Sequence, residues 1–125
     1  MGYKIHAYNR PGKRHGGGVC IITDPNKIKA EENKFKRRGF EIISIKGKVL
    51  HLNRDYVFYC IYLPPNLGKK KAEEASCLVS EDIARIKLQL NNPIVIVGGD
   101  INQYGINDCV LDHDEFTIVP PLPTR

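Results

Sequence analysis

The stretch IVIVGGDIN, residues 94–102, does most to decide the fold of this chain. Its first four residues form a short, wholly apolar run, which is typical of a strand at the centre of a sheet that helices cover. Gly98 and Gly99 follow directly, and then Asp100 and Asn102. In such sheets, ligands tend to meet the carboxyl ends of strands, where loops open into a crevice. The stretch therefore predicts a buried strand that delivers polar residues to a candidate site.

The segments before this stretch predict further strands and one helix. Apolar residues recur at three- and four-residue steps from about Glu73 to Leu90, which predicts an amphipathic helix that ends before Pro93. Four runs rich in β-branched and aromatic residues predict strands. These runs are residues 3–8, 19–23, 40–45 and 56–62, and the last is continuous enough to be buried on both faces. The charged residues 26–38 predict a loop or a loop with one helical turn, and residues 116–119 are β-prone. Strands followed by a helix and a strand describe an α/β or α+β domain.

Length and composition set the class of protein. With 125 residues, a net charge of +5 and 42% hydrophobic residues, the chain allows one domain at most and is not disordered. No stretch approaches the roughly 18 to 20 apolar residues of a membrane span, and the first residues lack the apolar core of a signal peptide. We therefore expect no membrane partner and an intracellular location, in the nucleus or cytoplasm. The four cysteines have no zinc-ligand spacing, and Cys20 and Cys60 are predicted to be small core residues.

The charges are divided unevenly along the chain. Residues 1–71 hold 16 Lys and Arg against 5 Asp and Glu, a balance of +11, whereas residues 72–125 hold 3 against 9, a balance of −6. A basic half is a candidate surface for a polyanion, because cations that neutralise phosphates release condensed counterions. A solvated surface is the alternative.

Asp100 and Asn102 are the first candidate site residues. A carboxylate can orient or deprotonate water, an amide can donate to a phosphoryl oxygen, and residues two apart on an extended chain project to one side. Gly98 and Gly99 leave room for a substrate to approach. The alternative is a turn, since Gly, Asp and Asn favour turns for local reasons.

Other polar residues are weaker candidates. The phenol of Tyr62, at the end of another buried strand, could reach a phosphate oxygen, or Tyr62 could be a core residue. Arg10, Lys13 and Arg14 could bind phosphates or form a solvated hairpin tip. The run 112–114, Asp-His-Asp, suggests a triad or a metal site, but consecutive residues do not converge on one point unless the loop is tightly folded.

Several motifs in a fixed order give a resemblance to a known family. They are GGGVCI, CIYLPPN, the amphipathic helix, IVIVGGDIN and FTIVPPLPTR, and they cover the chain from about Arg10 to Arg125. Together they resemble the endonuclease/exonuclease/phosphatase superfamily, and in particular the apurinic-like endonuclease domain of LINE-type retrotransposons. The resemblance implies a DNase I-like fold, a layered β-sandwich flanked by helices.

The resemblance also implies a reaction and roles for residues. The reaction would be hydrolysis of a DNA phosphodiester with Mg²⁺ or Mn²⁺ as cofactor. Asp100 would orient or deprotonate the attacking water, Asn102 would contact the scissile phosphate and support Asp100, and Tyr62 would hydrogen-bond near the phosphate. From the residues alone, and not from the resemblance, Arg10, Lys13, Arg14 and Gly99 are the candidates to bind substrate. The metal ligands are unknown. The partner would be DNA, and the chain would be a monomer or part of a polyprotein with a reverse transcriptase.

The chain departs from the family pattern at both ends. The N-terminal strands with an Asn and a metal-binding Glu, and the C-terminal strands with an Asp-His pair, are not found in residues 1–125. Asp112-His113 is not that pair, because it precedes the Pro-Thr-Arg landmark. We therefore expect a single partial domain with little or no nuclease activity by itself. The alternatives are a nucleic-acid-binding remnant without catalysis, and a phosphatase or phosphodiesterase of the same fold.

Overall fold

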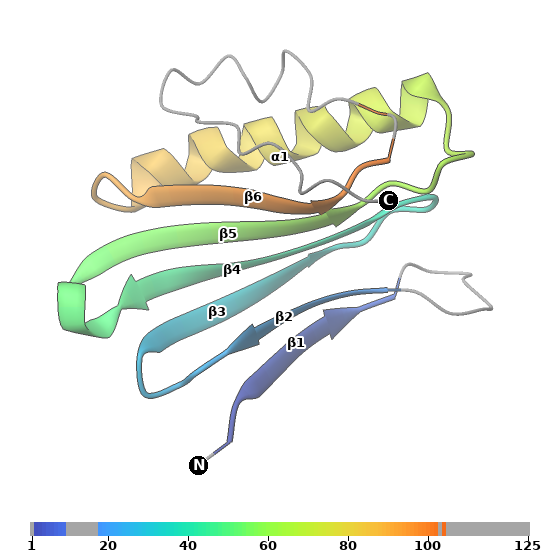
Figure 1. Ribbon diagram of the computed structural model, residues 1–125. Helices are drawn as coiled ribbons and strands as arrows, with labels where there is room; N and C mark the ends of the chain where they lie inside the picture. The colour runs from blue at the N-terminus through green and yellow to red at the C-terminus, as the bar shows by residue number, and fades with distance from the viewer. Residues whose placement is uncertain (1, 10–17, 103, 105–125) are drawn as a thin grey trace.

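The computed structural model describes residues 2–9, 18–102 and 104 of the chain, which form two sheets and one long helix (Figure 1). The elements, in chain order, are β1 (Lys4–Tyr8), β2 (Val19–Thr23), β3 (Ile28–Phe35), β4 (Glu41–Val49), the 3-10 helix η1 (Leu50–Leu52), β5 (Arg54–Tyr62), α1 (Lys69–Gln89) and β6 (Ile94–Asp100). Strands β1 and β2 form an antiparallel pair, and the other four form a sheet in the order β3-β4-β5-β6.

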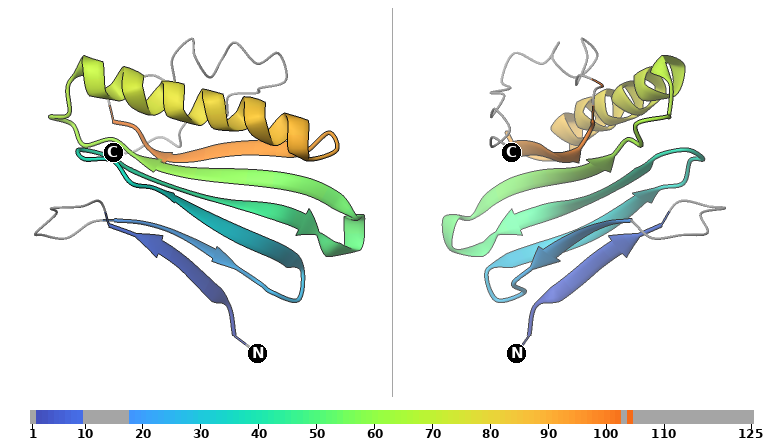
Figure 2. Two further views of the ribbon diagram at one scale, coloured as in Figure 1. Left: turned by 180° about the vertical axis from the view of Figure 1, so that it is seen from behind. Right: turned by 45° about the vertical axis from the view of Figure 1, so that its right-hand side comes forward.

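Helix α1 covers one face of the four-stranded sheet, and the β1–β2 pair lies against the other (Figure 2). The helix buries a stripe that includes Ala75, Val79, Ile83 and Ile86. These four positions follow the three- and four-residue spacing of one helix face. The resulting layers confirm the predicted α/β architecture, with a sheet between a helix and a second sheet.

Strand β5 lies between two separate apolar clusters, which confirms the prediction that it is buried on both faces. Val57, Tyr59 and Ile61 pack under α1. Tyr56 and its alternate neighbours along the strand pack toward β2. Successive side chains of a strand point to opposite faces, so the nearly continuous apolar run of β5 supplies both cores.

The order of the strands brings distant parts of the chain to one edge. Strands β3, β4 and β5 are successive antiparallel neighbours, whereas β6 pairs with β5 in parallel after the chain has crossed through α1. Parallel neighbours need such a crossover, and their carboxyl ends meet at the same edge of the sheet. Both β5 and β6 end beside the start of α1 (Figure 1).

The prediction of a loop over residues 26–38 was wrong, because β3 occupies Ile28–Phe35 and pairs with β4 along its whole length. Strand β3 lies at one edge of the sheet as described, and edge strands commonly bear charges on exposed positions. The acidic and basic residues that hide its pattern are exposed, whereas Ile28 and Ala30 pack toward β2 and Phe35 packs under α1.

Three other expectations also change. Helix α1 begins at Lys69, four residues earlier than predicted, because its first turn is polar and lacks the apolar spacing. Within the described residues β6 lies at the edge of its sheet rather than at the centre, and its Ile96 is 45% exposed. Cys20 is exposed and not a core residue, because it lies on the outward face of β2, whereas Cys60 packs in the cluster toward β2. The β-prone residues 116–119 lie outside the described residues.

Helix α1 bears too many charged residues to cross a membrane, and the part of the chain that the structure describes has no helix long and apolar enough to do so.

Candidate active site

The candidate site lies where β5 and β6 end together. Tyr62 is the last residue of β5 and Asp100 is the last residue of β6, and the two are partners in the parallel ladder. Partners in a ladder point to the same face of the sheet, so both side chains project toward the side of β1 and β2. The backbone N–H of Leu63 donates to the carbonyl oxygen of Asp100 at 2.9 Å, which extends this pairing beyond the strand ends.

Gly99 allows the two strands to approach closely just before the site. Its φ is +127°, and a Cβ built on it would lie 2.0 Å from the carbonyl oxygen of Ile61. Only glycine accepts that backbone angle and that approach without strain. Gly99 was predicted to make room for substrate, and its observed role in the fold is to make room for β5.

A tight turn fixes the Asp100 carboxylate. The backbone N–H of Asn102 donates to Asp100 Oδ1 at 3.0 Å, and Asn102 has a φ of +51°. Asn102 Nδ2 also donates to the carbonyl oxygen of Leu63 at 2.6 Å. The two residues are therefore held together by a turn and not by extended alternation, because the strand ends at Asp100. The turn, which was the alternative interpretation of this stretch, is present, and it places Asp100 and Asn102 next to each other.

Tyr104 joins the site to the start of α1. Its hydroxyl accepts a hydrogen bond from the backbone N–H of Gly68 at 2.7 Å and donates to the carbonyl oxygen of Pro65 at 3.0 Å. The segment 63–68 is thus bonded to Asn102 at one end and to Tyr104 at the other. These bonds fix the loop that passes from the candidate site into the helix.

A row of polar side chains crosses the sheet at this end. Glu41 is opposite Tyr62 in the antiparallel β4–β5 ladder, and Tyr62 is opposite Asp100 in the β5–β6 ladder. Glu41 is fully buried, and Tyr8 lies near it. Burial raises the pKa of Tyr8, the charge of Glu41 raises it further and Arg37 lowers it. Among the described residues the Tyr8 hydroxyl is the buried side-chain oxygen that lacks a hydrogen-bond partner.

Sequence reasoning missed Glu41 and Tyr104. The signal for Glu41 is a single acidic residue inside the apolar run Phe40–Ile43, where an ionisable group requires a specific environment. No sequence pattern singles out Tyr104, since its role depends on contacts with a distant loop.

The remaining predicted site residues lie outside the described residues. Arg10, Lys13 and Arg14 are outside them, as are Asp112, His113 and Asp114.

The described residues also include two histidines, His6 and His51. His51 is exposed. His6 is buried, with Nδ1 2.8 Å from Glu32 Oε1 and Nε2 3.3 Å from Thr23 Oγ1. His6 thus links β1 to β2 and β3 and serves the structure.

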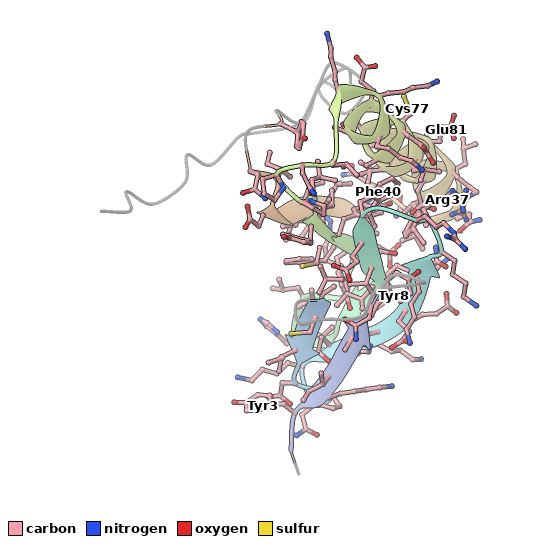
Figure 3. All side chains as sticks on the ribbon, turned by 90° about the vertical axis from the view of Figure 1, so that its right-hand side faces the viewer. Tyr3, Tyr8, Arg37, Phe40, Cys77 and Glu81 are labelled. Atoms are coloured by element: carbon pink, nitrogen blue, oxygen red, sulfur yellow. The ribbon has the colours of Figure 1, made fainter. Side chains whose placement is uncertain are left out.

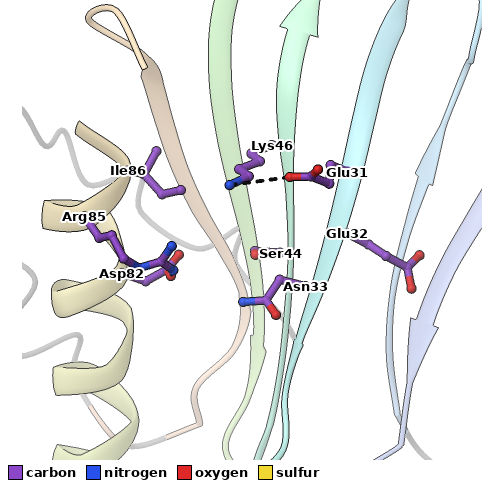
Figure 4. A pocket seen from close by; sticks show the side chains of 8 residues that line it. All are labelled: Glu31, Glu32, Asn33, Ser44, Lys46, Asp82, Arg85 and Ile86. Carbon is purple, nitrogen blue, oxygen red and sulfur yellow. Dashed lines mark hydrogen bonds and ion pairs between the residues drawn. The ribbon is translucent and has the colours of Figure 1, made fainter. Parts of the chain in front are cut away.

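A polar cavity of about 310 Å³ lies elsewhere, between α1 and strands β3 and β4 (Figure 4). Its charges are compensated internally, because Lys46 pairs with Glu31 at 3.4 Å and Arg85 pairs with the buried Asp82. Asp82 also accepts a 2.6 Å hydrogen bond from the hydroxyl of Tyr59. The charged side chains of this cavity thus pair with one another, and we do not treat the cavity as a second candidate site.

The described residues do not make up a magnesium site by themselves. Magnesium is bound by carboxylates together with waters and substrate phosphates. Within the described ranges no three Asp, Glu, His or Cys side chains gather as metal ligands, and Asp100 is the exposed carboxylate of the site. This part of the chain therefore offers one carboxylate to a metal and not a full set of ligands.

No protein-family model and no curated protein sequence matches this chain. Solved structures share its fold, among them two from Bacteroides thetaiotaomicron. An endonuclease/exonuclease/phosphatase family protein from Bacteroides thetaiotaomicron matches with a TM-score of 0.70 and 19% identity, over 89% of this chain and 46% of that one. A mannosyl-6-phosphatase from Bacteroides thetaiotaomicron VPI-5482 matches with a TM-score of 0.66 and 20% identity, over 89% of this chain and 48% of that one. This chain thus spans about half the length of either structure. The layered sheets, the crossover helix and these two likenesses identify the fold of the chain as part of the fold of the endonuclease/exonuclease/phosphatase proteins.

Proposed function

We propose that this chain provides the strand-end residues of a metal-dependent phosphodiester hydrolase that nicks DNA, as in LINE-type retrotransposons. One observation carries the proposal: the parallel β5–β6 pair brings Tyr62 beside Asp100, while the turn at Asn102 orients the Asp100 carboxylate. A phenol, a carboxylate and an amide on rigid strand ends suit the orientation of a phosphate ester and of the water that attacks it.

Each residue has a role in the proposed reaction. Asp100 accepts the proton of the attacking water as the water oxygen bonds to phosphorus. The bond from phosphorus to the leaving oxygen breaks, and the leaving oxygen keeps the electron pair and takes a proton from solvent. The phenol of Tyr62 donates to a phosphoryl oxygen, and Asn102 contacts the scissile phosphate. If a magnesium ion, which the resemblance implies, were held with the help of Asp100, it would supply charge stabilisation for phosphoryl oxygens and would lower the pKa of bound water. Without a full set of metal ligands, we expect the 125 residues alone to nick DNA weakly or not at all.

A second turn in the same chain is a matched control for binding. Asp24 accepts a 3.0 Å hydrogen bond from the backbone N–H of Asn26, the same contact that Asp100 accepts from Asn102. The Asp24 turn has no Tyr62 equivalent and does not follow a parallel strand pair. Any difference between the two turns therefore reports the surroundings of the site and not the turn.

The test is a titration of the ¹⁵N-labelled chain with a short DNA duplex and Mg²⁺, followed by amide chemical shifts. We expect shifts at Asn102 and Leu63 and none at Asn26. Asp100→Asn should remove the Mg²⁺-dependent part of the shifts. Equal shifts at both turns, or none at Asn102, would contradict the proposal.

Hydrolysis gives an independent measurement. Any slow nicking of supercoiled plasmid with Mg²⁺ should disappear in Asp100→Ala and persist in Asp24→Ala. Robust nicking that survives Asp100→Ala would exclude Asp100 as the base. Robust nicking that Asp100→Ala abolishes would contradict only the expectation of weak activity.

A phosphomonoesterase of the same fold is the second candidate function, and the neighbour named a mannosyl-6-phosphatase favours it. Mannose 6-phosphate replaces the duplex in the same titration. Shifts at Asn102 with the sugar phosphate, and none with the duplex, would favour the phosphatase over the nuclease. Binding of the duplex without any hydrolysis, and without Asp100 dependence, would favour a nucleic-acid-binding remnant.

A further inference from the structure

The fold brings two basic segments together at the end of the molecule that holds the candidate site. The loop between β3 and β4 contains Lys36, Arg37 and Arg38, and α1 begins with three lysines, residues 69–71. Lys71 Nζ donates to the carbonyl oxygen of Arg38 at 3.4 Å. Arg37 lies beside the helix in Figure 3, which looks onto this end. We name these six residues the basic rim.

The position of the three lysines is unfavourable for the helix. The N-terminus of a helix bears a partial positive charge and is stabilised by acidic residues and by side-chain caps. The first turn of α1 contains no acidic residue, and its N-cap, Gly68, provides no side-chain hydrogen bond. Helix stability therefore does not explain three consecutive lysines at this position.

Most of the rim is not neutralised by neighbours. Glu74 lies 3.9 Å from Arg37 Nε and 3.7 Å from Lys71 Nζ, so one carboxylate serves two of the cations. Within the described ranges, no carboxylate comes within ion-pair distance of Lys36, Arg38, Lys69 or Lys70. These four residues are exposed, so their charges face solvent.

The segment that leads into the rim is hydrogen-bonded to the candidate site. The segment 63–68 runs from the strand end at Tyr62 into Lys69, and hydrogen bonds from Asn102 and Tyr104 fix its two ends. The charges of the rim therefore lie at a fixed place relative to Asp100. The rim and the site share this end of the sheet, so phosphates bound by the rim would lead to Asp100 around the ends of β5 and β6.

We propose that the basic rim binds the phosphodiester backbone of nucleic acid and directs it to the candidate active site. This inference rests on the proposed function, because it names a partner for the same site. Closely spaced cations neutralise successive phosphates and release counterions, which makes the affinity depend on salt.

The test compares two triple variants of the full chain. The rim variant is Lys69→Gln, Lys70→Gln and Lys71→Gln. The control variant is Lys4→Gln, Lys27→Gln and Lys29→Gln, which removes the same charge from exposed lysines outside the rim. Fluorescence anisotropy with a labelled DNA duplex, in EDTA to prevent hydrolysis, gives the affinity over a range of salt concentrations. Thermal unfolding checks that each variant is folded.

We expect the rim variant to bind about tenfold more weakly or worse, with the salt slope reduced by about 2 to 3, or roughly 0.9 for each phosphate that is no longer neutralised. The control variant should lose much less affinity. The rim variant should keep or raise its Tm, since the change removes charge that opposes the helix dipole. An RNA duplex in place of the DNA duplex shows which nucleic acid provides the phosphodiester backbone. Tight binding of either duplex supports the proposal that the rim binds such a backbone.

Three results would overturn the inference: equal losses in the two variants, no binding by the wild type at low salt, or tighter binding to phosphatidylserine vesicles than to either duplex. The proposed function fails separately. Its test follows Asp100-dependent shifts and hydrolysis with Mg²⁺, whereas the test of the rim follows affinity in EDTA with Asp100 intact. An absence of Asp100-dependent shifts or hydrolysis would therefore leave the rim standing, and a rim variant with wild-type affinity would leave Asp100 in its role.

Discussion

Gly99→Ala should destabilise the chain and disturb the candidate site together. The new Cβ would lie 2.0 Å from the carbonyl oxygen and 2.7 Å from the backbone nitrogen of Ile61, so β5 and β6 must separate locally. Alanine at a φ of +127° adds backbone strain of about 1–3 kcal/mol. One weakened β5–β6 hydrogen bond adds about 0.5–1.5 kcal/mol. The expected loss in the free energy of unfolding is therefore about 1.5–4.5 kcal/mol.

Gly98→Ala is the matched control, one residue away. A Cβ on Gly98 would find its nearest neighbour, Phe58 Cζ, at 3.9 Å, and its backbone angle suits alanine. We expect no loss, or a gain of about 0.4–1 kcal/mol from the reduced entropy of the unfolded chain. Urea unfolding measures both values, and the Asn102 amide shift reports the site. Equal stabilities for the two variants would refute the steric argument.

Three further changes have defined outcomes. Ile83→Ala empties a fully buried position under α1 and should cost about 2–5 kcal/mol in urea unfolding. Glu41→Gln should lower the pKa of Tyr8, since the nearby charge adds to the effect of burial, and ¹³Cζ-tyrosine NMR measures that pKa. The hydrogen bond with His6 lowers the pKa of Glu32, so its stabilising contribution is present above the unfolded pKa of about 4.5 and is lost as the pH falls through the folded pKa. Glu32→Gln should therefore reduce the acid dependence of unfolding.

Each of these three has a control in the same chain. Leu88→Ala, at a position 90% exposed, should change stability by no more than about 0.5 kcal/mol. Tyr8→Phe assigns the Tyr8 resonance, and an unchanged pKa in Glu41→Gln would show that the charge does not reach Tyr8. Glu31→Gln removes a neighbouring, more exposed carboxylate and should leave the acid dependence nearly intact. A larger effect for Glu31 than for Glu32 would contradict the role of His6.

Local patterns in the sequence predicted much of the fold. The runs of β-branched and aromatic residues in β2 and β5 predicted strands, and the spacing of Val79, Ile83 and Ile86 predicted the buried face of α1. Strand β3 was missed because an edge strand can bury little, and its charged residues then resemble a loop. Cys20 was misplaced because a short apolar run does not show which of its residues face inward.

The candidate site was predicted from the ends of two strands. The structure adds the register between these strands and the contacts that depend on it. The pairing of Tyr62 with Asp100 depends on a parallel register between strands separated by a helix, which no local pattern specifies. The bond from Asn102 to Leu63 depends on the same register. Glu41 and Tyr104 take part through contacts between distant segments, so periodicity does not reveal them.

The crossover through α1 has a consequence for the order of folding. The antiparallel strands β3, β4 and β5 follow one another directly, so their contacts are close in sequence. Strand β6, in contrast, is separated from β5 in the sequence by the 21-residue helix α1. Contacts between segments distant in sequence form late, since closing a long loop costs entropy before it is repaid. We expect pulse-labelled hydrogen exchange to show protection in β4 before β6. The pairing of Tyr62 with Asp100 would then form last. A folding intermediate that precedes this step would have most of the sheet but would lack the candidate site.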